Sequence, residues 1–367
     1  MNEVNIINDQ HLFSGIFTHS LKLQQNLISH GYKSEFFQFL ISETDGRLLE
    51  NATVKKGFLF GAGNNSEFIH QTKLALNFIS GRNWRSFKRV EGRNFILSGP
   101  TLMNLSKYLE NTIVIGHDLY FMEKVGNPVL RTYMKRMYKL YKSQKIILAN
   151  SDFTKNDFIK RLGIDEHRIL TVYPSFDTDL FHPGMSDIRS KLNLDENDRI
   201  VLSVSGDNPN KNVESVLRLM ARLPSNYKLI RVGPTITTAK TVENLSLSSR
   251  IYHMKGIDEQ ILADLYRGAD LFIFPSLYEG FGIPLVEAMA SGTPVLTSNR
   301  TCLPEVVGEA GIVCDPFDIK AMEEAILRLE KEDSFKKELI KKGLERSAHF
   351  NKEKQFKSLS NALKLLE

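Results

Sequence analysis

Residues 270–298 constrain the fold of this chain more than any other stretch. Leu271–Phe274 is a short apolar run that Pro275 ends, which predicts a strand buried on both faces, because proline lacks the amide hydrogen that a central strand donates. A loop with two glycines follows, and apolar residues then recur at helical spacing over 283–290. This order of strand, glycine loop and helix predicts a parallel α/β sheet, whose carboxyl edge binds anionic ligands.

Two carboxylates accompany the start of this helix. Glu279 lies in the loop before the helix and Glu287 lies about one turn inside it, so both can face the same crevice. A carboxylate near a phosphate site is unfavourable unless it meets hydroxyl groups or a developing positive charge. A sugar supplies both, so the pair favours a sugar ligand.

The stretch resembles the Glu-x7-Glu signature of the retaining glycosyltransferases of family 4, which have the two-domain GT-B fold. The resemblance rests on Pro275-Ser276, Glu279-Gly280-Phe281-Gly282, Pro284, Glu287-Ala288, Gly292-Thr293-Pro294-Val295 and Leu303-Pro304-Glu305. It implies an α/β protein with two Rossmann-like parallel-sheet domains that face each other across a cleft. It also implies transfer of a hexose-type sugar from a nucleotide-diphosphate sugar to an acceptor hydroxyl, with retention of configuration. It extends over nearly the whole chain and is most specific over 271–305.

The rest of the chain alternates strand and helix patterns, which implies mostly parallel sheets with right-handed crossovers. The predicted strands are 4–7, 34–39, 56–60, 94–97, 112–116, 145–149, 168–172, 199–204, 228–232, 250–254, 271–274, 294–297 and 311–313. A polar segment with Pro183-Gly184 separates two halves, so we predict an acceptor-side domain over 1–183 and a nucleotide-sugar-binding domain over 184–351. In the resembling fold the last helix, 352–366, packs back on the first domain.

Composition excludes several other classes of protein. A chain of 367 residues with 42% hydrophobic residues can bury two cores, and a net charge of +5 falls short of a nucleic-acid-binding signature. Cys302 and Cys314 are too few for a disulfide framework or a structural zinc site. The sequence shows neither a signal-peptide pattern nor an apolar run of ~18 residues, so we expect a cytoplasmic protein that can lie peripherally at the inner membrane face.

The resemblance assigns three catalytic residues. Lys211, in Asn208-Pro209-Asn210-Lys211-Asn212, takes the place of the lysine that stabilises the leaving diphosphate. His117, at the end of a predicted strand, takes the place of the active-site histidine that faces the donor sugar. Glu279 would hold the hydroxyls of the sugar ring.

Further residues are assigned to substrate binding. Glu287 would accept hydrogen bonds from the two ribose hydroxyls, and N–H groups at the helix start would stabilise the departing charge without a metal ion. Backbone near glycines would approach the diphosphate and read the edge of the base. These positions are Phe281, Gly282 and Ile283 at the helix start, Gly15 after the first strand, and Gly256 and Ile257 after strand 250–254.

One position departs from the family pattern. Gly206 stands five residues before Lys211, where the family has an arginine, so half of the usual diphosphate clamp is missing unless another basic group replaces it. The alternative function is therefore a catalytically impaired GT-B protein that binds a nucleotide sugar as a regulatory or partner subunit. A nicotinamide dehydrogenase is excluded because residues 8–17 hold one glycine in place of Gly-x-Gly-x-x-Gly.

No metal ion and no other cofactor is expected. Asp177-Thr178-Asp179 looks like the metal-binding Asp-x-Asp of the other large glycosyltransferase fold, but it lies in the predicted linker without a second cluster of ligands. The donor base and sugar are not identified by the sequence.

Two basic stretches bear on the acceptor. Residues 82–89 combine cations with the only tryptophan, and a second set recurs at helical spacing, namely Arg131, Lys135, Arg136, Lys139 and Lys142 beside Tyr138 and Tyr141. Such groups can contact an anionic membrane or a phosphorylated acceptor, and a solvated helix face explains them equally well. The acceptor itself, a glycan or a lipid-linked molecule, stays open.

Overall fold

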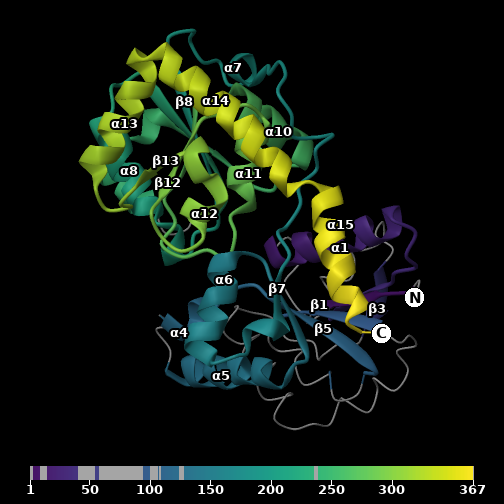
Figure 1. Ribbon diagram of the computed structural model, residues 1–367. Helices are drawn as coiled ribbons and strands as arrows, with labels where there is room; N and C mark the ends of the chain where they lie inside the picture. Colours follow the sequence, from purple (N-terminus) through teal and green to yellow (C-terminus); the bar gives the residue numbers. More distant parts are fainter. Residues whose placement is uncertain are drawn as a thin grey trace. The chain divides into compact units, whose positions relative to one another are not determined.

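The structure is a computed structural model that describes residues 3–8, 15–39, 54–57, 94–99, 106, 109–123, 128–234 and 239–366. The chain forms two compact units (Figure 1). Unit 1 comprises residues 1–175 and 352–367, and unit 2 comprises residues 176–351.

Unit 1 is built on a seven-stranded sheet in the order β3-β2-β1-β4-β5-β6-β7. Its strands are β1 (Asn5–Asn8), β2 (Phe36–Phe39), β3 (Val54–Gly57), β4 (Asn94–Ser98), β5 (Asn111–Gly116), β6 (Ile146–Ala149) and β7 (Ile169–Thr171). All neighbouring pairs are parallel. The described helices are α1 (Gly15–Ser29), α4 (Tyr120–Glu123), α5 (Pro128–Lys139), α6 (Asp152–Asp157) and α15 (Lys352–Lys364), with short turns η4 (Leu140–Ser143), η5 (Phe158–Leu162) and η6 (Glu166–Arg168).

The central strands β1, β4, β5 and β6 are buried on both faces, which explains why they read as mostly apolar runs. Successive side chains of a strand point to opposite faces, so Ile7 packs with α5, η4 and η5, whereas Ile6 packs with α1 and α15. Tyr141 of η4 is fully buried, and its hydroxyl donates to the carbonyl of Ile115 at 2.9 Å. The sheet is therefore the middle of three layers.

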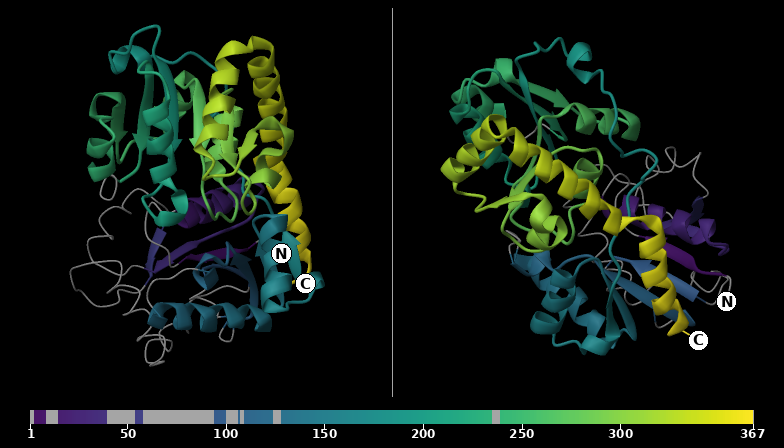
Figure 2. Two further views of the ribbon diagram at one scale, coloured as in Figure 1. Left: turned by 90° about the vertical axis from the view of Figure 1, so that its left-hand side faces the viewer. Right: turned by 45° about the horizontal axis from the view of Figure 1, so that its top comes forward.

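The last helix, α15, belongs to unit 1. Figures 1 and 2 show it in yellow beside α1 and the strands of that unit. Leu359 is fully buried in the same core as α1. A buried polar contact fixes the helix start, because Gln355 Oε1 accepts hydrogen bonds from Asn26 Nδ2 and Ser175 Oγ, each at 2.8 Å. The final residues of the chain thus complete the core of its first half.

Unit 2 has a six-stranded parallel sheet in the order β10-β9-β8-β11-β12-β13. Its strands are β8 (Arg199–Val204), β9 (Tyr227–Val232), β10 (Ile251–Met254), β11 (Leu271–Phe274), β12 (Val295–Ser298) and β13 (Ile312–Cys314). The described helices are α7 (Ile188–Lys191), α8 (Val213–Arg222), α9 (Ala239–Asn244), α10 (Glu259–Gly268), α11 (Ile283–Ala290), α12 (Leu303–Val307), α13 (Ile319–Lys331) and α14 (Asp333–Ser347), with short turns η7 (Pro209–Lys211), η8 (Ser248–Arg250), η9 (Gly308–Ala310) and η10 (Ala348–Phe350).

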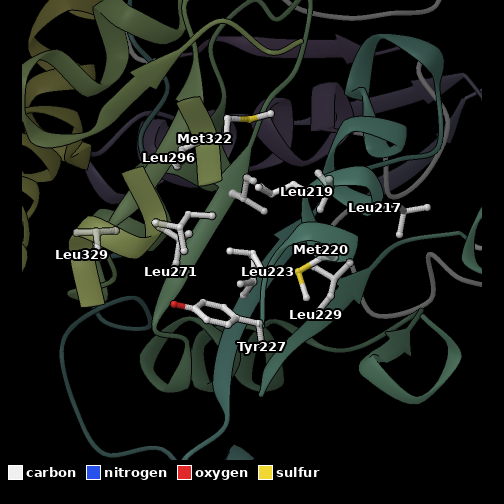
Figure 3. Close-up of a cluster of buried hydrophobic side chains, with 14 of the residues drawn as sticks. Leu217, Leu219, Met220, Leu223, Tyr227, Leu229, Leu271, Leu296, Met322 and Leu329 are labelled. Atoms are coloured by element: carbon white, nitrogen blue, oxygen red, sulfur yellow. The ribbon is translucent and has the colours of Figure 1, made fainter. Parts of the chain in front are cut away.

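Helices cover both faces of this second sheet as well. Figure 3 shows one face, where leucine and methionine side chains of α8 and α13 meet those of β9, β11 and β12. On the other face, Tyr266 of α10 makes edge contacts with the rings of Phe272 and Phe181, at centroid distances of 5.4 and 5.9 Å. Unit 2 is therefore also a helix–sheet–helix sandwich.

Two predicted boundaries differ from the structure. The division between the units lies after Ser175 and not after residue 183, because Phe176 and Phe181 are buried and Arg267 Nη2 donates to the carbonyl of Leu180 at 2.6 Å. These contacts attach the linker to unit 2. Strand β3 begins at Val54, earlier than the predicted 56–60, and residues 58–60 lie outside the described residues.

Removing the buried side chain of Leu359 should destabilise unit 1. Leu359→Ala leaves a cavity between α15 and the sheet, and we expect it to lower the free energy of unfolding by about 2–5 kcal/mol. Urea denaturation followed by circular dichroism measures the loss. Asn361→Ala, at an exposed position of the same helix, is the control and should stay within about 0.5 kcal/mol of wild type. Equal effects of both substitutions would contradict the packing described here.

Candidate functional site

The strand order of unit 2 reverses between β8 and β11. The chain proceeds from β8 to β9 and β10 on one side of this point, and from β11 to β12 and β13 on the other. The loops that leave the carboxyl ends of β8 and β11 therefore diverge and leave a crevice, which is where open α/β sheets bind ligands. The β8 loop carries Lys211, and the β11 loop carries Glu279.

Lys211 and Glu279 form an ion pair at this point. Lys211 Nζ lies 2.6 Å from Glu279 Oε1, and the two side chains are 21% and 13% exposed. Backbone contacts reinforce the pair, because Leu277 N donates to the carbonyl of Asn210 at 2.7 Å and Asn210 Nδ2 donates to the carbonyl of Tyr278 at 3.0 Å. The two predicted catalytic residues of unit 2 are thus in direct contact, on loops that are bonded to each other.

The loop after β12 also makes hydrogen bonds to the backbone of the Glu279 loop. The amide of Glu279 donates to Thr301 Oγ1 at 3.2 Å, and Cys302 Sγ donates to the carbonyls of Glu279 and Phe281 at 3.2 and 3.3 Å. Burial, together with the charges of Glu279 and Glu305, raises the pKa of the Cys302 thiol well above its usual value, so it remains a donor. Sequence reasoning missed both residues, because they stand about twenty positions from the motif that they support.

Helix α11 begins at the predicted anion site. Gly282 precedes the helix with φ 97°, a left-handed conformation that favours glycine, and no side chain of the described residues caps the helix. Pro284 occupies the first turn, where its missing N–H removes no helical bond. The backbone of Phe281, Gly282 and Ile283 therefore stands at the positive end of the helix dipole, at the carboxyl edge of the sheet.

Glu287 is a buried acid on the same helix. Its side chain is only 6% exposed, and its Oε2 accepts a hydrogen bond of 3.3 Å from the Tyr266 hydroxyl. Burial, followed by the charge of Glu287, raises the pKa of Tyr266 well above its usual value, so the phenol stays protonated and donates. Tyr266 orients one carboxylate oxygen of Glu287, a role that the apolar pattern of α10 did not suggest.

Gly256 and Ile257 follow β10 at the same edge of the sheet. Gly256 has φ 62°, and the space around its Cα is open, with no atom within 4 Å of the place where a Cβ would stand. Asp258 then caps α10, because its Oδ1 accepts a 2.7 Å hydrogen bond from Ile261 N. The predicted base-reading segment is therefore a short open turn.

Unit 1 has a polar cluster at the carboxyl ends of β4 and β5, beside the point where its own strand order reverses. His117 follows β5, is 8% exposed and lies with Nε2 2.9 Å from Ser98 Oγ. Ser98 Oγ is in turn 2.7 Å from Ser20 Oγ, and the ring of His19 meets that of His117 edge-on at 5.6 Å. Gly15 is the first residue of α1, the helix that carries Ser20 and His19.

Both histidines of this cluster are kept neutral. Burial, and then the charge of Lys22, lowers the pKa of His19 from 6.5 to about 4. Burial and the neighbouring His19 also lower the pKa of His117 well below its usual value. His19 Nε2 is buried and has no hydrogen-bond partner among the described residues. A neutral imidazole can accept a hydrogen bond from a hydroxyl group, which an imidazolium cannot.

The structure does not support the proposed membrane-facing aromatics. Tyr138 and Tyr141 are 3% and 1% exposed and belong to the core of unit 1, so they are not interfacial. The reason is that the helical period turns them towards the sheet while Arg136 and Lys139 face outward. Residues 82–89 lie outside the described residues. No helix in the described part of the chain is both long enough and apolar enough to span a membrane.

Asp177 and Asp179 are part of a turn in the linker. The carboxylate of Asp177 accepts the N–H of Asp179 at 3.1 Å. Within the residues that the structure describes, no three His, Cys, Asp or Glu side chains are grouped closely enough to hold a metal ion.

Comparisons with known proteins point to one family. The family model described as "Glycosyl transferases group 1" matches residues 185–346. The O-antigen chain mannosyltransferase B of Escherichia coli is 30% identical over 288 residues, which are 75% of this chain and 75% of that protein. The MMP alpha-(1->4)-mannosyltransferase of Mycolicibacterium hassiacum is 31% identical over 211 residues, which are 53% of this chain and 49% of that protein.

Solved structures share the fold over nearly the whole chain. A sucrose-phosphate synthase from Thermosynechococcus elongatus has a TM-score of 0.80 at 21% identity and covers 100% of this chain and 99% of its own. The Anabaena protein Alr3699/HepE, in complex with UDP and glucose, has a TM-score of 0.80 at 16% identity, with 98% and 99% covered. WaaG, a glycosyltransferase involved in lipopolysaccharide biosynthesis, has a TM-score of 0.74 at 18% identity, with 98% of both chains covered.

The buried histidines should make stability fall as the pH falls. His19 has a pKa of about 4 in the folded chain and about 6.5 when unfolded, so the unfolded chain binds more protons below pH 6.5. Its contribution is complete above about pH 6.5 and is lost progressively towards pH 4. Between pH 7 and pH 5 this loss is about 2 kcal/mol for His19 alone.

Urea titrations of His19→Gln at pH 5, 6 and 7 measure this contribution. The variant should lose less stability than wild type over this range, by about 1–2 kcal/mol. His167→Gln, at an exposed position, is the control and should follow wild type. A wild-type pH dependence in His19→Gln would show that His19 is not held neutral by the fold.

Proposed function

The chain belongs to the group 1 glycosyltransferases, and on that premise we propose that it is a retaining enzyme of family 4 that acts without a metal ion. The protein is a glycosyltransferase with the GT-B fold. The proposed reaction moves a hexose from a nucleotide-diphosphate sugar to an acceptor hydroxyl. The observation that carries the proposal is the convergence of Lys211, Glu279 and the uncapped start of α11 at the strand-order reversal of unit 2.

Stabilisation of the leaving diphosphate is assigned to Lys211 and the start of α11. A nucleotide diphosphate gains negative charge as its bond to the sugar breaks, and donors already in position lower the energy of that charge. Phe281, Gly282 and Ile283 provide backbone N–H groups at the helix end, and Lys211 provides an ammonium group. This charge stabilisation does not require a metal ion, and we expect transfer to persist in the presence of a chelator.

Glu279 would change partners when the donor binds. In the structure its carboxylate neutralises Lys211, whose ammonium has three N–H donors. A diphosphate beside Lys211 would compete for these donors and leave Glu279 to accept hydrogen bonds from sugar hydroxyls. The contact of Thr301 with the Glu279 amide keeps the backbone of the loop in place during this exchange. Glu279 then orients the anomeric carbon with respect to the acceptor.

Glu287 is assigned to the ribose, and the turn after β10 to the base. A carboxylate whose two oxygens accept from two adjacent hydroxyls recognises a diol, and Tyr266 holds the carboxylate in one orientation. Gly256 and Ile257 present backbone groups in an open turn, which suits recognition of the edge of a base.

Unit 1 would contribute His117 and the backbone at Gly15. As a neutral imidazole, His117 can exchange a hydrogen bond with a hydroxyl of the donor sugar, and Ser98 fixes the orientation of its ring. Gly15, which begins α1 and has no side chain, would let the backbone approach the diphosphate.

The relatives suggest a donor sugar and a product class. Two relatives named above are mannosyltransferases, and the Escherichia coli protein acts on the O-antigen chain according to its name. We therefore propose mannose as the hexose and a glycan or lipid-linked glycan as the acceptor. Tyr138 and Tyr141 give no support to peripheral contact with an anionic membrane, because both are buried.

A catalytically impaired, nucleotide-sugar-binding subunit is the second candidate. It is favoured by Gly206, which cannot supply the charge of an arginine side chain at this position. Binding without transfer distinguishes this function from the first.

Two isosteric substitutions should separate binding from transfer. Glu287→Gln removes a charge-assisted hydrogen bond to the ribose and should weaken nucleoside diphosphate binding about 10-fold or more. Glu279→Gln should change that affinity only a few-fold but should lower transfer about 100-fold, because it affects the reacting sugar. Calorimetry with UDP, GDP, ADP and dTDP measures binding, and product formation from the matching sugars, with and without a chelator, measures transfer.

Glu309→Gln, at an exposed ion pair with Lys342, is the matched control and should behave like wild type. A wild-type protein that binds none of the four nucleotides would contradict the proposed function. Binding without transfer to any acceptor would favour the impaired subunit, and complete loss of transfer on chelation would disprove metal independence.

A further inference from the structure

We infer that Arg231, on the strand next to β8, binds the donor diphosphate in place of the arginine that is missing at Gly206. The inference rests on the proposed function, because it concerns how the same site recognises its donor. It is carried by the position of the Arg231 guanidinium, by its burial and by the absence, among the described residues, of a carboxylate close enough to form an ion pair with it.

Gly206 occupies a position that does not require glycine. Its φ is not in the left-handed region, and no atom lies within 4 Å of the place where a Cβ would stand. Neither backbone strain nor crowding therefore accounts for glycine at this position. What lies beside its backbone is a guanidinium from another strand, because Arg231 Nη2 donates to the carbonyl of Gly206 at 3.0 Å.

The side chain of Arg231 extends towards the carboxyl edge of the sheet. Arg231 is the next-to-last residue of β9 and pairs in register with Ser203 of β8. Its Nη1 contacts the carbonyl of Val232, and a Cβ on Gly233 would stand only 2.6 Å from Nη1 and 3.1 Å from Nη2. The guanidinium thus lies past the end of its own strand. It contacts the β8 loop, which continues to Lys211.

The charge of Arg231 is poorly compensated. The residue is 4% exposed, both of its hydrogen bonds go to carbonyl oxygens, and the described residues give it no ion pair with a carboxylate. Burial lowers the pKa of Arg231, and the charge of Asp207 opposes that shift only in part. A buried cation with carbonyl partners alone is unfavourable, and a bound anion would relieve this cost.

A guanidinium also fits the ligand chemically. It has five N–H donors in a planar fork, and two of these are used on carbonyls in the structure. The remaining donors match the spacing of phosphate oxygens, which a single lysine cannot reproduce. Arg231 and Lys211 would then flank the diphosphate from neighbouring strands, which restores the clamp from a different position in the sequence.

Arg250, at the edge of the same sheet, is a control residue for Arg231, because its contacts are those of a purely structural arginine. Arg250, just before β10, donates to the carbonyls of Tyr227 and Pro224 at 3.0 and 2.8 Å, and burial lowers its pKa too. It lies at the amino edge of the strands, away from the proposed site. Arg250→Gln therefore controls for the loss of a partly buried guanidinium that binds only carbonyls.

The experiment compares Arg231→Gln, Arg250→Gln and the double variant Arg231→Gln/Gly206→Arg with wild type. Calorimetry measures their affinity for inorganic pyrophosphate, for the nucleoside diphosphate that wild type prefers, and for the corresponding nucleoside. We expect Arg231→Gln to weaken pyrophosphate and the diphosphate about 10-fold or more, with nucleoside affinity unchanged. Gly206→Arg should recover much of this loss, and Arg250→Gln should lower only the melting temperature.

Each other outcome decides against one of the two proposals. Wild-type affinity for pyrophosphate in Arg231→Gln would overturn the inference and leave the proposed function intact. Equal weakening of diphosphate and nucleoside would also overturn it, because the role would then be structural. If wild type binds no nucleoside diphosphate, the proposed function itself fails. If Arg231→Gln does not fold, Arg231→Lys replaces it in the experiment. Lysine lacks the planar set of guanidinium N–H donors, so an unchanged affinity of Arg231→Lys for pyrophosphate would overturn the inference.

Discussion

The ion pair between Lys211 and Glu279 is the contact on which the site of unit 2 depends. The strand order reverses between β8 and β11, so the two crossover connections leave in opposite directions and nothing in the sheet itself joins their loops. The 2.6 Å pair and the backbone bonds of Asn210 make that connection. Because both side chains are largely shielded from water, loss of either partner would leave the other charge in an unfavourable setting. The pair therefore favours one arrangement of both loops.

The arrangement of strands could be predicted from the sequence because parallel strands are buried on both faces. Leu271–Phe274 and Arg199–Val204 have the predicted bounds, and most other strands shift by one or two residues. The linker was harder to predict, since Pro183-Gly184 is a strong breaker while the preceding residues are polar. Only the structure shows that Phe181 packs against Tyr266 of unit 2, and no local pattern contains this contact.

The candidate site shows the same limit. Lys211, Glu279 and Glu287 could be proposed from the sequence because each stands in an ordered motif, and their roles stay predictions. Thr301, Cys302 and Tyr266 could not, because their bonds to these motifs join residues about twenty or more positions apart. Arg231 did carry a signal, since an arginine within an apolar strand of a buried sheet needs a polar partner. The helical spacing of cations beside Tyr138 and Tyr141 suggested two interfacial tyrosines. This was wrong, because the same helical period turns both aromatic rings towards the core.

The return of α15 to unit 1 has a consequence for how the chain is made. Unit 2 is one continuous segment, 176–351, inserted between the first 175 residues and the helix that completes their core. During synthesis, unit 2 can fold as soon as its own last helix leaves the ribosome. The sheet of unit 1 must wait, with the face that α1 and α15 share only partly covered, until α15 emerges, although its strands are translated first. The core of unit 1, whose strands are translated first, is therefore completed only after unit 2 has been translated.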